Sequence, residues 1–343
     1  MTRTFVMGDP QGPFDKVLAV LDRHKLLAGD RLAPDAVLVS IGDHFDYDHK
    51  HPETARAEGL RLLRWLASHD PAQVHLILGN HDASRVMELS GLSDDEFALA
   101  RTCGDYAERF PALPPQHVLA RDYASFSVEQ RELVQELLES RRFHLALAGK
   151  LDRREVLITH TGVTTRELGL LGLLATESAQ HIAAALETFF ATAISRGTSP
   201  LSLAPLHLAG GGGREGGGLL YHRPSATPPP DPARPRRFDP RTLPNGLVQI
   251  AGHSGHAKCV HELGDWCTWR AKERPHGGLR TLRVSGAEVS YDLGVAADDY
   301  HDAVGGWSGG DGAAELILID GELRRVPADE VDLLEISGVA VLA

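Results

Sequence analysis

The chain has 343 residues, of which 42% are apolar, so it is long enough to bury a sizeable core in one large α/β domain or at most two. Its net charge of −12 excludes a broad surface for nucleic acids or anionic membranes, because such partners are bound chiefly through Lys and Arg. A small phosphorylated substrate is compatible with this charge, since metal ions supply positive charge locally.

The sequence contains no stretch of 18 apolar residues, and strand-forming residues begin close to the N-terminus without a basic and apolar leader. The three cysteines, Cys103, Cys259 and Cys267, are odd in number and lack CxxC spacing, which argues against a disulfide framework. We therefore expect a cytoplasmic protein.

The first predicted strand ends on polar side chains. Residues 5–12 read FVMGDPQG, so a short apolar run stops at a glycine and presents Asp9 and Gln11. The glycines of this turn let the backbone bend tightly beside a ligand. A helix is predicted to follow, with Val17 and Leu21 on its apolar face.

The second predicted strand ends on two carboxylates. Residues 37–47 read VLVSIGDHFDY, with Asp43 and Asp46 directly after the glycine. A buried strand of this kind delivers acidic groups to its carboxyl end, where open α/β sheets bind their ligands. A histidine-rich stretch accompanies them, with His44, His49 and His51. Their spacing matches no metal pattern, which favours a solvated loop over additional metal ligands.

The third predicted strand follows the same rule. Residues 74–82 read VHLILGNHD and end on Asn80, His81 and Asp82. Within the first 82 residues, three strands thus close on oxygen or imidazole groups, which is more than an α/β sheet needs in order to fold. Because these are the groups that bind divalent metals, the pattern predicts a metal site.

The next segment, from about residue 91 to 145, is predicted to be mostly helical. Ser93 with Glu96, and Ser127 with Gln130, both have the S-x-x-E/Q pattern of a capping box at a helix start. A proline-rich break, FPALPPQ, separates the two helix starts.

Two later strands each deliver a lone histidine. Residues 155–162 read EVLITHTG and present His160, and residues 247–255 read LVQIAGHSG and present His253. The intervening residues 208–245 are rich in Gly and Pro, which predicts a mobile loop. We do not expect a domain boundary there, because His253 must return to the same site.

Four arginines of this loop are candidates for contacts with a substrate phosphate, although a solvated loop is the favoured interpretation: Arg214, Arg223, Arg236 and Arg237. After His253, short β-type runs separated by Gly-containing turns predict further strands, the last of which, at about 312–343, are expected to form a C-terminal hairpin unit.

Five motifs, GDPQG, GDHFDY, GNHD, THTG and AGHSGH, resemble in order and context those of the calcineurin-like metallophosphoesterase superfamily, in its phosphoprotein-phosphatase-like branch. That family's pattern is D-x-H, G-D-x-x-D, G-N-H-D/E, a lone His and a closing G-H. The resemblance implies an α/β fold, a four-layer αββα sandwich of two mixed β-sheets flanked by helices. It further implies a single domain over residues 1–343, with 91–145 inserted as a helical cap.

The resemblance also implies the chemistry. Two divalent ions are expected, most simply Mn²⁺, with Fe or Zn²⁺ as alternatives. By motif, Asp9, Gln11 and Asp43 hold the first ion. The second ion is held by Asp43, Asn80, His160 and His253, so that Asp43 bridges the two. A hydroxide shared by the ions attacks phosphorus, and His81 protonates the leaving oxygen while Asp46 orients its imidazole.

Position 11 departs from the family pattern, because Gln stands where the family has His. A neutral amide oxygen is a harder ligand than imidazole, so the first ion should be held more weakly and Mn²⁺ favoured over Zn²⁺. His256 is a candidate to compensate. The Arg that follows the second Asp in the protein phosphatases is also absent, because Tyr47 follows Asp46, and Arg85 is a candidate replacement.

The favoured function is hydrolysis of a phosphomonoester, phosphoproteins included. One alternative is a nucleotide phosphohydrolase that acts on a dinucleoside polyphosphate or a cyclic nucleotide. The other is a non-catalytic binding scaffold with the same fold, for which Gln11 is the only indication. The expected partner is accordingly a phosphorylated small molecule, a nucleotide or a phosphoprotein.

Overall fold

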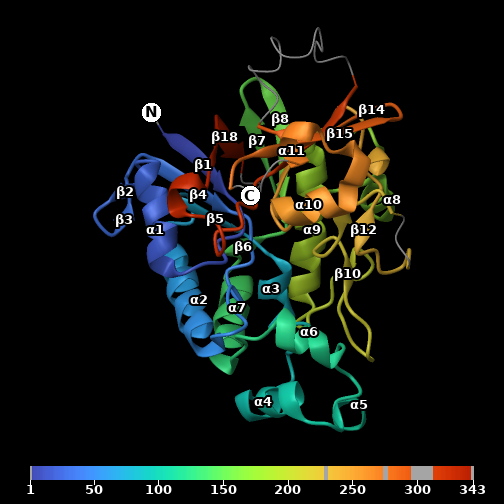
Figure 1. The fold of residues 1–343 in the computed structure, drawn as a ribbon. Helices are drawn as coiled ribbons and strands as arrows, with labels where there is room; N and C mark the ends of the chain where they lie inside the picture. The colour runs from blue at the N-terminus through green and yellow to red at the C-terminus, as the bar shows by residue number, and fades with distance from the viewer. Residues whose placement is uncertain (1, 228–230, 273–276, 295–311, 341–343) are drawn as a thin grey trace.

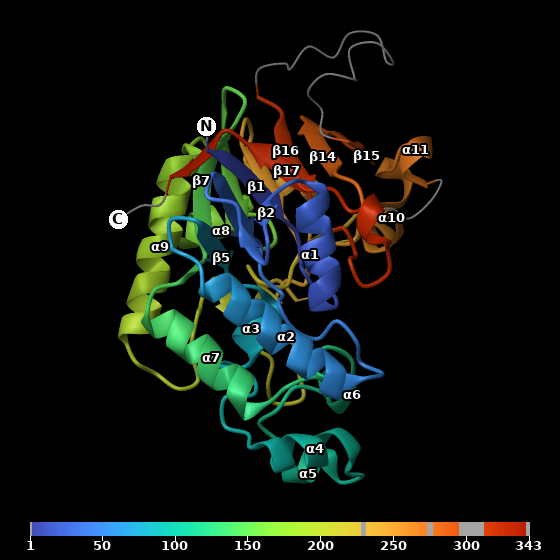
Figure 2. The same ribbon diagram turned by 90° about the vertical axis from the view of Figure 1, so that its left-hand side faces the viewer.

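Two β-sheets lie face to face in the computed structural model of the chain, which describes residues 2–227, 231–272, 277–294 and 312–340 (Figures 1 and 2). The first sheet has the strand order β17-β1-β4-β5-β6. Its four parallel strands are β1 (Arg3–Met7), β4 (Ala36–Ser40), β5 (Val74–Ile77) and β6 (Phe143–His144). Helices α1 (Phe14–Arg23) and α2 (Pro52–Ala67) make the crossover connections between the first three.

The second sheet has the order β15-β14-β16-β13-β8-β7-β18. Its parallel centre consists of β16 (Ala314–Leu318), β13 (Val248–Ala251) and β8 (Arg154–Thr159). Antiparallel strands complete it on both sides: β14 (Arg280–Ser285), β15 (Glu288–Leu293), β7 (Ala146–Leu151) and β18 (Gly338–Ala340).

Side chains of the central strands alternate between two cores, because successive residues of a strand point to opposite faces. In the first sheet, Val6 and Val39 face the second sheet, whereas Phe5 and Leu38 face the helices. In the second sheet, Ile158, Ile250 and Ile317 pack between the sheets. The strands are apolar on both faces, which is typical of parallel strands covered on each side.

Helices cover both outer faces of the sheet pair. α1, α2 and α7 (Val128–Glu139) lie over the first sheet, and α9 (Ala179–Ser195) packs on β7 and β8 (Figure 2). α10 (His256–Leu263) and α11 (Trp269–Lys272) share a core with β14, β15 and β16. The predicted α/β sandwich of two mixed sheets flanked by helices is thus confirmed. Among the described residues, no helix combines the length and the apolar character needed to cross a membrane.

The segment between β5 and β6 is helical. It contains α4 (Asp94–Thr102), α5 (Tyr106–Arg109), α6 (Gln116–Arg121) and α7, and both predicted capping boxes are formed at Ser93 and Ser127. α4 and α5 project away from the two sheets (Figure 1). The C-terminal end of α6 returns toward the sheet edge and brings Arg121 and Asp122 to a cavity described below.

Two stretches differ from the sequence-based expectation. The Gly- and Pro-rich residues 208–245, of which 228–230 lie outside the described residues, contain paired short strands and bury Tyr221. Those strands are β9 (His207–Leu208), β10 (Gly217–Gly218), β11 (Arg223–Pro224) and β12 (Arg237–Phe238).

Within the expected C-terminal unit, β16 lies at the centre of the second sheet, β17 (Leu334–Ile336) joins the first sheet beside β1, and β18 joins the second sheet beside β7. β17 and β18 therefore form no hairpin with each other, and residues 341–343 lie outside the described residues. A short strand in the sequence does not indicate which sheet edge will accept it.

Candidate active site

Six strands, three from each sheet, end at the same edge of the sandwich. β1, β4 and β5 of the first sheet are parallel, as are β8, β13 and β16 of the second. The carboxyl ends of β1, β4, β5, β13 and β16 open into a cavity of about 690 Å³. Its walls include the side chains of Asp9, Gln11, Asp43, Asn80, His81 and His253. The sequence motifs thus converge as the strand ends predict.

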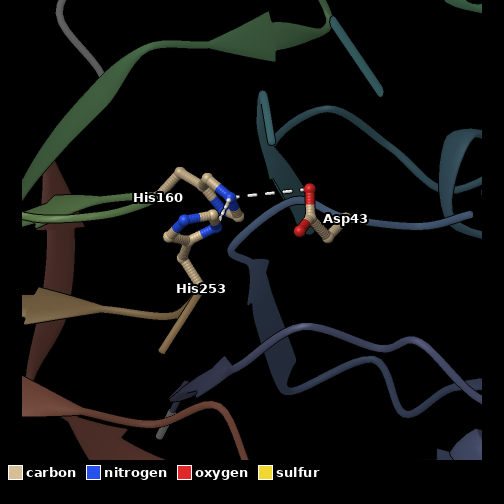
Figure 3. Close-up of side chains that lie close together, drawn as sticks. All are labelled: Asp43, His160 and His253. Carbon is tan, nitrogen blue, oxygen red and sulfur yellow. Dashed lines mark hydrogen bonds and ion pairs between the residues drawn. The ribbon is translucent and has the colours of Figure 1, made fainter. Parts of the chain in front are cut away.

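Asp43, His160 and His253 form the centre of the site (Figure 3). One ligand atom of each lies within 4.8 Å of the others, and all three side chains are buried. His160 Nε2 lies 3.5 Å from Asp43 Oδ1 and 3.2 Å from His253 Nδ1. Asn80 Oδ1 is 3.1 Å from the same His160 nitrogen. These are four donor atoms of the kinds that hold divalent metals.

Hydrogen bonds outside the cluster orient both imidazoles. His160 Nδ1 donates to the carbonyl oxygen of Ile41 at 2.7 Å, and His253 Nε2 donates to that of Tyr221 at 3.0 Å. Each bond leaves the lone pair of the other ring nitrogen free within the cluster that these histidines form with Asp43. Metal-binding histidines are held in this way, so the residues present fit a divalent ion.

Asp9 lies beside this cluster and is anchored to it by the backbone. Both of its carboxylate oxygens accept the N–H of His253, at 2.9 and 3.0 Å. Burial raises the pKa of Asp9 well above its usual range, and the nearby carboxylates of Asp320 and Asp43 raise it further. Crowded buried carboxylates of this kind are stabilised by a cation, which supports a metal at this position.

Gln11 also lines the cavity. Its Nε2 donates to the carbonyl oxygen of Phe45 at 3.1 Å, so that the amide nitrogen is used within the protein. The amide oxygen is left as the group with which Gln11 can bind a ligand.

The site backbone is held in uncommon conformations. Asp43, Asp46 and His253 have φ angles of 56°, 65° and 60°, which are costly for residues with a side chain. Gly42 has φ 88°, and a Cβ on Gly79 would lie 2.3 Å from the backbone nitrogen of Asp43. The loops after β4 and β5 can approach this closely only because glycine stands at both positions.

Asp82, the last residue of the GNHD motif, ties these two loops together. It is fully buried at the start of α3 (Asn80–Ser84), and its Oδ2 accepts the N–H groups of Gly79 and Asp43 at 3.0 and 2.9 Å. The same oxygen lies 3.0 Å from Nδ1 of His44. Asp82 therefore holds together the loop after β4, which carries Asp43, and the loop after β5, which carries Asn80.

His81 and Asp46 form a pair at the cavity wall. His81 Nδ1 donates to Asp46 Oδ2 at 3.0 Å, while His81 Nε2 lies 3.8 Å from Asp43 Oδ2. Burial alone would lower the pKa of His81, but the charges of Asp43 and Asp46 outweigh it and raise the pKa to about 9. The raised pKa favours the protonated ring, which presents a donor next to the cluster of Asp43, His160 and His253.

Asp46 is fully engaged by protein groups. Arg85 lies 2.6 Å from its Oδ2, and the N–H and hydroxyl of Ser125 donate to Oδ1 at 2.9 and 2.6 Å. Burial would raise the pKa of Asp46, but Arg85 and His81 prevail and hold it well below the usual range. Asp46 thus stays ionised and fixes the ring of His81.

Several expected roles are corrected by the structure. Arg85 is completely buried against Asp46 and lies over the ring of Phe45, so it cannot reach a substrate phosphate. His44 is buried between Asp82 and Ser40, which makes it a structural residue rather than part of a solvated loop. His256 stacks on Tyr291 and lies 3.1 Å from its hydroxyl.

The remaining loop histidines lie near or outside the cavity. His49 lines the cavity, and His51 is exposed and bonded to Asp48. Of the four loop arginines, Arg223 and Arg236 line the cavity. The charge of Arg223 acts on both Asp9 and His253.

One cavity residue, Asp320, escaped the sequence analysis. It follows β16 in the stretch ELILIDG, an apolar run that ends on an acidic residue and a glycine. The same signal marks the other site strands and could have identified Asp320. It was missed because no motif of the family includes it.

A protein-family model matches the N-terminal half of the chain. Residues 2–185 of the 343-residue chain match the model of the calcineurin-like phosphoesterase family. The match covers more than half of the chain, and the protein therefore belongs to this family. His253 and Asp320 lie beyond the matched residues, so their place in the site is known from the structure.

The matches among solved structures include three phosphatases. One is a protein serine/threonine phosphatase from Saccharomyces cerevisiae with similarity to human phosphatase PP5. The two sequences are 16% identical, the match covers 74% of this chain and 61% of that chain, and the TM-score is 0.34. Another is the phosphatase domain from the Legionella effector WipB. The sequences are 15% identical, the match covers 57% of this chain and 82% of that chain, and the TM-score is 0.35.

The third is the cold-active protein-tyrosine phosphatase of a psychrophilic Shewanella species. The sequences are 16% identical, the match covers 56% of this chain and 49% of that chain, and the TM-score is 0.32. The chain thus spans about half the length of this phosphatase. A comparison with curated proteins finds no match.

Proposed function

We propose that the protein is a phosphoesterase that depends on two divalent metal ions and hydrolyses a phosphomonoester, phosphoproteins included. The observation that carries this proposal is the pair of oriented imidazoles, His160 and His253, whose free nitrogens lie within 4.8 Å of each other and of a carboxylate oxygen of Asp43. Family membership supports the same class of reaction.

In this proposal Asp9, Gln11 and Asp43 bind one ion, and Asp43, Asn80, His160 and His253 bind the other. Bound divalent ions activate water as a nucleophile and offset the charge on the phosphoryl oxygens. The first set contains only oxygen donors, which favours Mn²⁺ over Zn²⁺ at that position.

The protein's own groups serve the leaving side and the phosphate. His81, held by Asp46, donates a proton from Nε2 to the departing oxygen. Arg223 and Arg236 stand on the cavity wall, and their guanidinium groups are suited to bind phosphoryl oxygens. Arg85 acts indirectly, because it keeps Asp46 ionised and in place.

The test is phosphate release from an aryl phosphate by protein that has been stripped with a chelator and then supplied with Mn²⁺. We expect no turnover before Mn²⁺ is added. Asp43→Asn should lose both metal binding and activity, because it alters the bridging ligand. Asp30→Asn makes the same chemical change at an exposed position and should behave as wild type.

Full turnover in the stripped protein, or in Asp43→Asn, would contradict the proposal. A panel containing a phosphoserine peptide, a phosphotyrosine peptide, a dinucleoside polyphosphate and a cyclic nucleotide then identifies the substrate class. Preference for either nucleotide would favour the nucleotide phosphohydrolase.

A further inference from the structure

Asp320 stands at the end of the sixth strand that reaches the site. β16 pairs in parallel with β13, which carries His253, and the N–H of Ile319 continues this pairing by donating to Ala251 at 2.9 Å. The residue after Ile319 is therefore placed at the cavity, as His253 is placed two residues after Ala251. Asp320 lines the cavity together with Asp9 and Gln11.

Glycines bring this strand end against the first motif. A Cβ on Gly8 would lie 2.9 Å from the Cα of Asp320, so the chain next to Asp9 can pass here only because it carries no side chain. A Cβ on Gly255 would lie 3.3 Å from Asp320 Oδ2, which places this oxygen beside the loop that follows His253. The Asp320 carboxylate is also close enough to interact electrostatically with Asp9 and Asp43.

The surroundings hold Asp320 in place without neutralising its carboxylate by direct contact. Its Oδ1 accepts the N–H of Glu322 at 2.9 Å. The buried guanidinium of Arg280 donates at 2.6 Å to the backbone carbonyl of Asp320, and its Nε and Nη1 have no partner in the described part of the chain. Arg280 therefore anchors the backbone, and its charge balances part of the negative charge nearby.

Glu322, two residues further on, also lines the cavity but is used differently. Its Oε1 pairs with Arg325 at 3.1 Å, and its Oε2 accepts the N–H of Ala257 at 3.3 Å. Both oxygens of Glu322 thus have partners within the protein, which makes it a matched control for Asp320.

We propose that Asp320 is a ligand of the first metal ion and supplies the strong donor that Gln11 does not provide. The first site then consists of oxygen donors from Asp9, Gln11, Asp43 and Asp320, next to a second site that contains two imidazoles. Such a site selects a hard ion such as Mn²⁺ or Mg²⁺ over Zn²⁺. This inference rests on the proposed two-metal function and specifies its first site.

The test is titration of metal-free protein with Mn²⁺, monitored by calorimetry and by electron paramagnetic resonance. Wild type should bind two ions and show the spin coupling of a close pair. Asp320→Asn should weaken the binding of the first ion by tenfold or more, while the other ion stays bound. The spin-coupled signal of the ion pair should be lost. Glu322→Gln should match wild type in both readouts.

Compensation for Gln11 is tested by the double variant. Gln11→His added to Asp320→Asn should restore binding of the second equivalent of Mn²⁺, because imidazole replaces the lost donor. If the double variant does not bind the second equivalent of Mn²⁺, the inference that Asp320 compensates for Gln11 is overturned. If circular dichroism shows Asp320→Asn to be unfolded, Asp320→Glu, which moves the carboxylate by one methylene, takes its place with the same expected weakening.

Two Mn²⁺ ions bound to Asp320→Asn with wild-type dissociation constants would overturn the proposal while leaving the two-metal function intact. Wild-type protein that binds fewer than two ions would instead reject the two-metal function, and the inference with it.

Discussion

At the scale of single residues, His81 separates metal binding from proton transfer. It is adjacent to Asn80 in sequence, yet its ring is bonded to Asp46 and is not one of the proposed ligands. His81→Ala should therefore retain both metal ions and lose about 10² to 10⁴ in rate on substrates with poor leaving groups. Activated aryl esters should lose less, because their leaving oxygens need little protonation.

The measurement is kcat on a series of aryl and alkyl phosphates, with the metal content determined in parallel. Asp46→Asn should act in the same direction, since it removes the charge that holds the imidazole. Equal losses on good and poor leaving groups, accompanied by loss of metal, would show that His81 only packs the turn.

At the scale of elements, the close approach of the loops after β4 and β5 depends on glycine. A Cβ on Gly79 would lie 2.3 Å from both the backbone nitrogen and the Oδ1 of Asp43. Gly79→Ala should destabilise the protein by about 1–3 kcal/mol or more, because the backbone carrying Asp43 must move. Metal affinity should fall as well, since Asp43 is the proposed bridge.

Urea denaturation and Mn²⁺ titration measure the two effects. Gly91→Ala is the matched control, because nothing lies within 4 Å of a Cβ at that position. Wild-type metal affinity in Gly79→Ala would mean that the two loops can separate without disturbing the site.

At the scale of the whole molecule, Glu88 links the segment after GNHD to the Gly-rich stretch. It is buried, and its Oε1 accepts the N–H of Gly210 at 2.8 Å. Burial raises the pKa of Glu88 from its ordinary 4.5 to about 7. At pH values between 4.5 and about 7, the Glu88 carboxyl is protonated in the folded protein but has lost its proton in the unfolded chain.

The free energy of unfolding should therefore fall as pH rises from 4.5 to about 7 and stay level above it, by a total of about 3 kcal/mol from this group. Glu88→Gln should remove this part of the slope, so that the variant gains on wild type as pH rises. Urea unfolding of metal-free protein across this range measures the difference. Identical slopes in the two proteins would contradict a buried, neutral Glu88.

Local sequence signals predicted the strands that end on polar groups and their convergence on one site, whereas the layers of the fold were expected from the family resemblance. An apolar run that stops at Gly and a polar group, as at Asp43, indicates both a buried strand and what stands at its end. Because parallel strands end at one edge, the convergence of Asp9, Asp43 and Asn80 follows from the chain order alone. The capping boxes at Ser93 and Ser127 were predictable for the same reason, since their partners lie three residues away.

The partners of buried charges could not be predicted in this way. Whether Arg85 meets a phosphate or Asp46, and whether His44 faces water or Asp82, depends on residues far apart in the chain. Such contacts leave no periodic pattern in the sequence.

By itself, the sequence determined the strand-end chemistry, because this arises from short-range patterns of apolar and polar residues, and the two-sheet sandwich followed from the resemblance of five motifs to a known family. Only the tertiary structure decided that β17 joins the first sheet and that Asp320 stands beside Asp9. The physical reason is that sheet-edge pairing and the meeting of buried charges are set by packing in three dimensions, where residues more than 300 positions apart become neighbours.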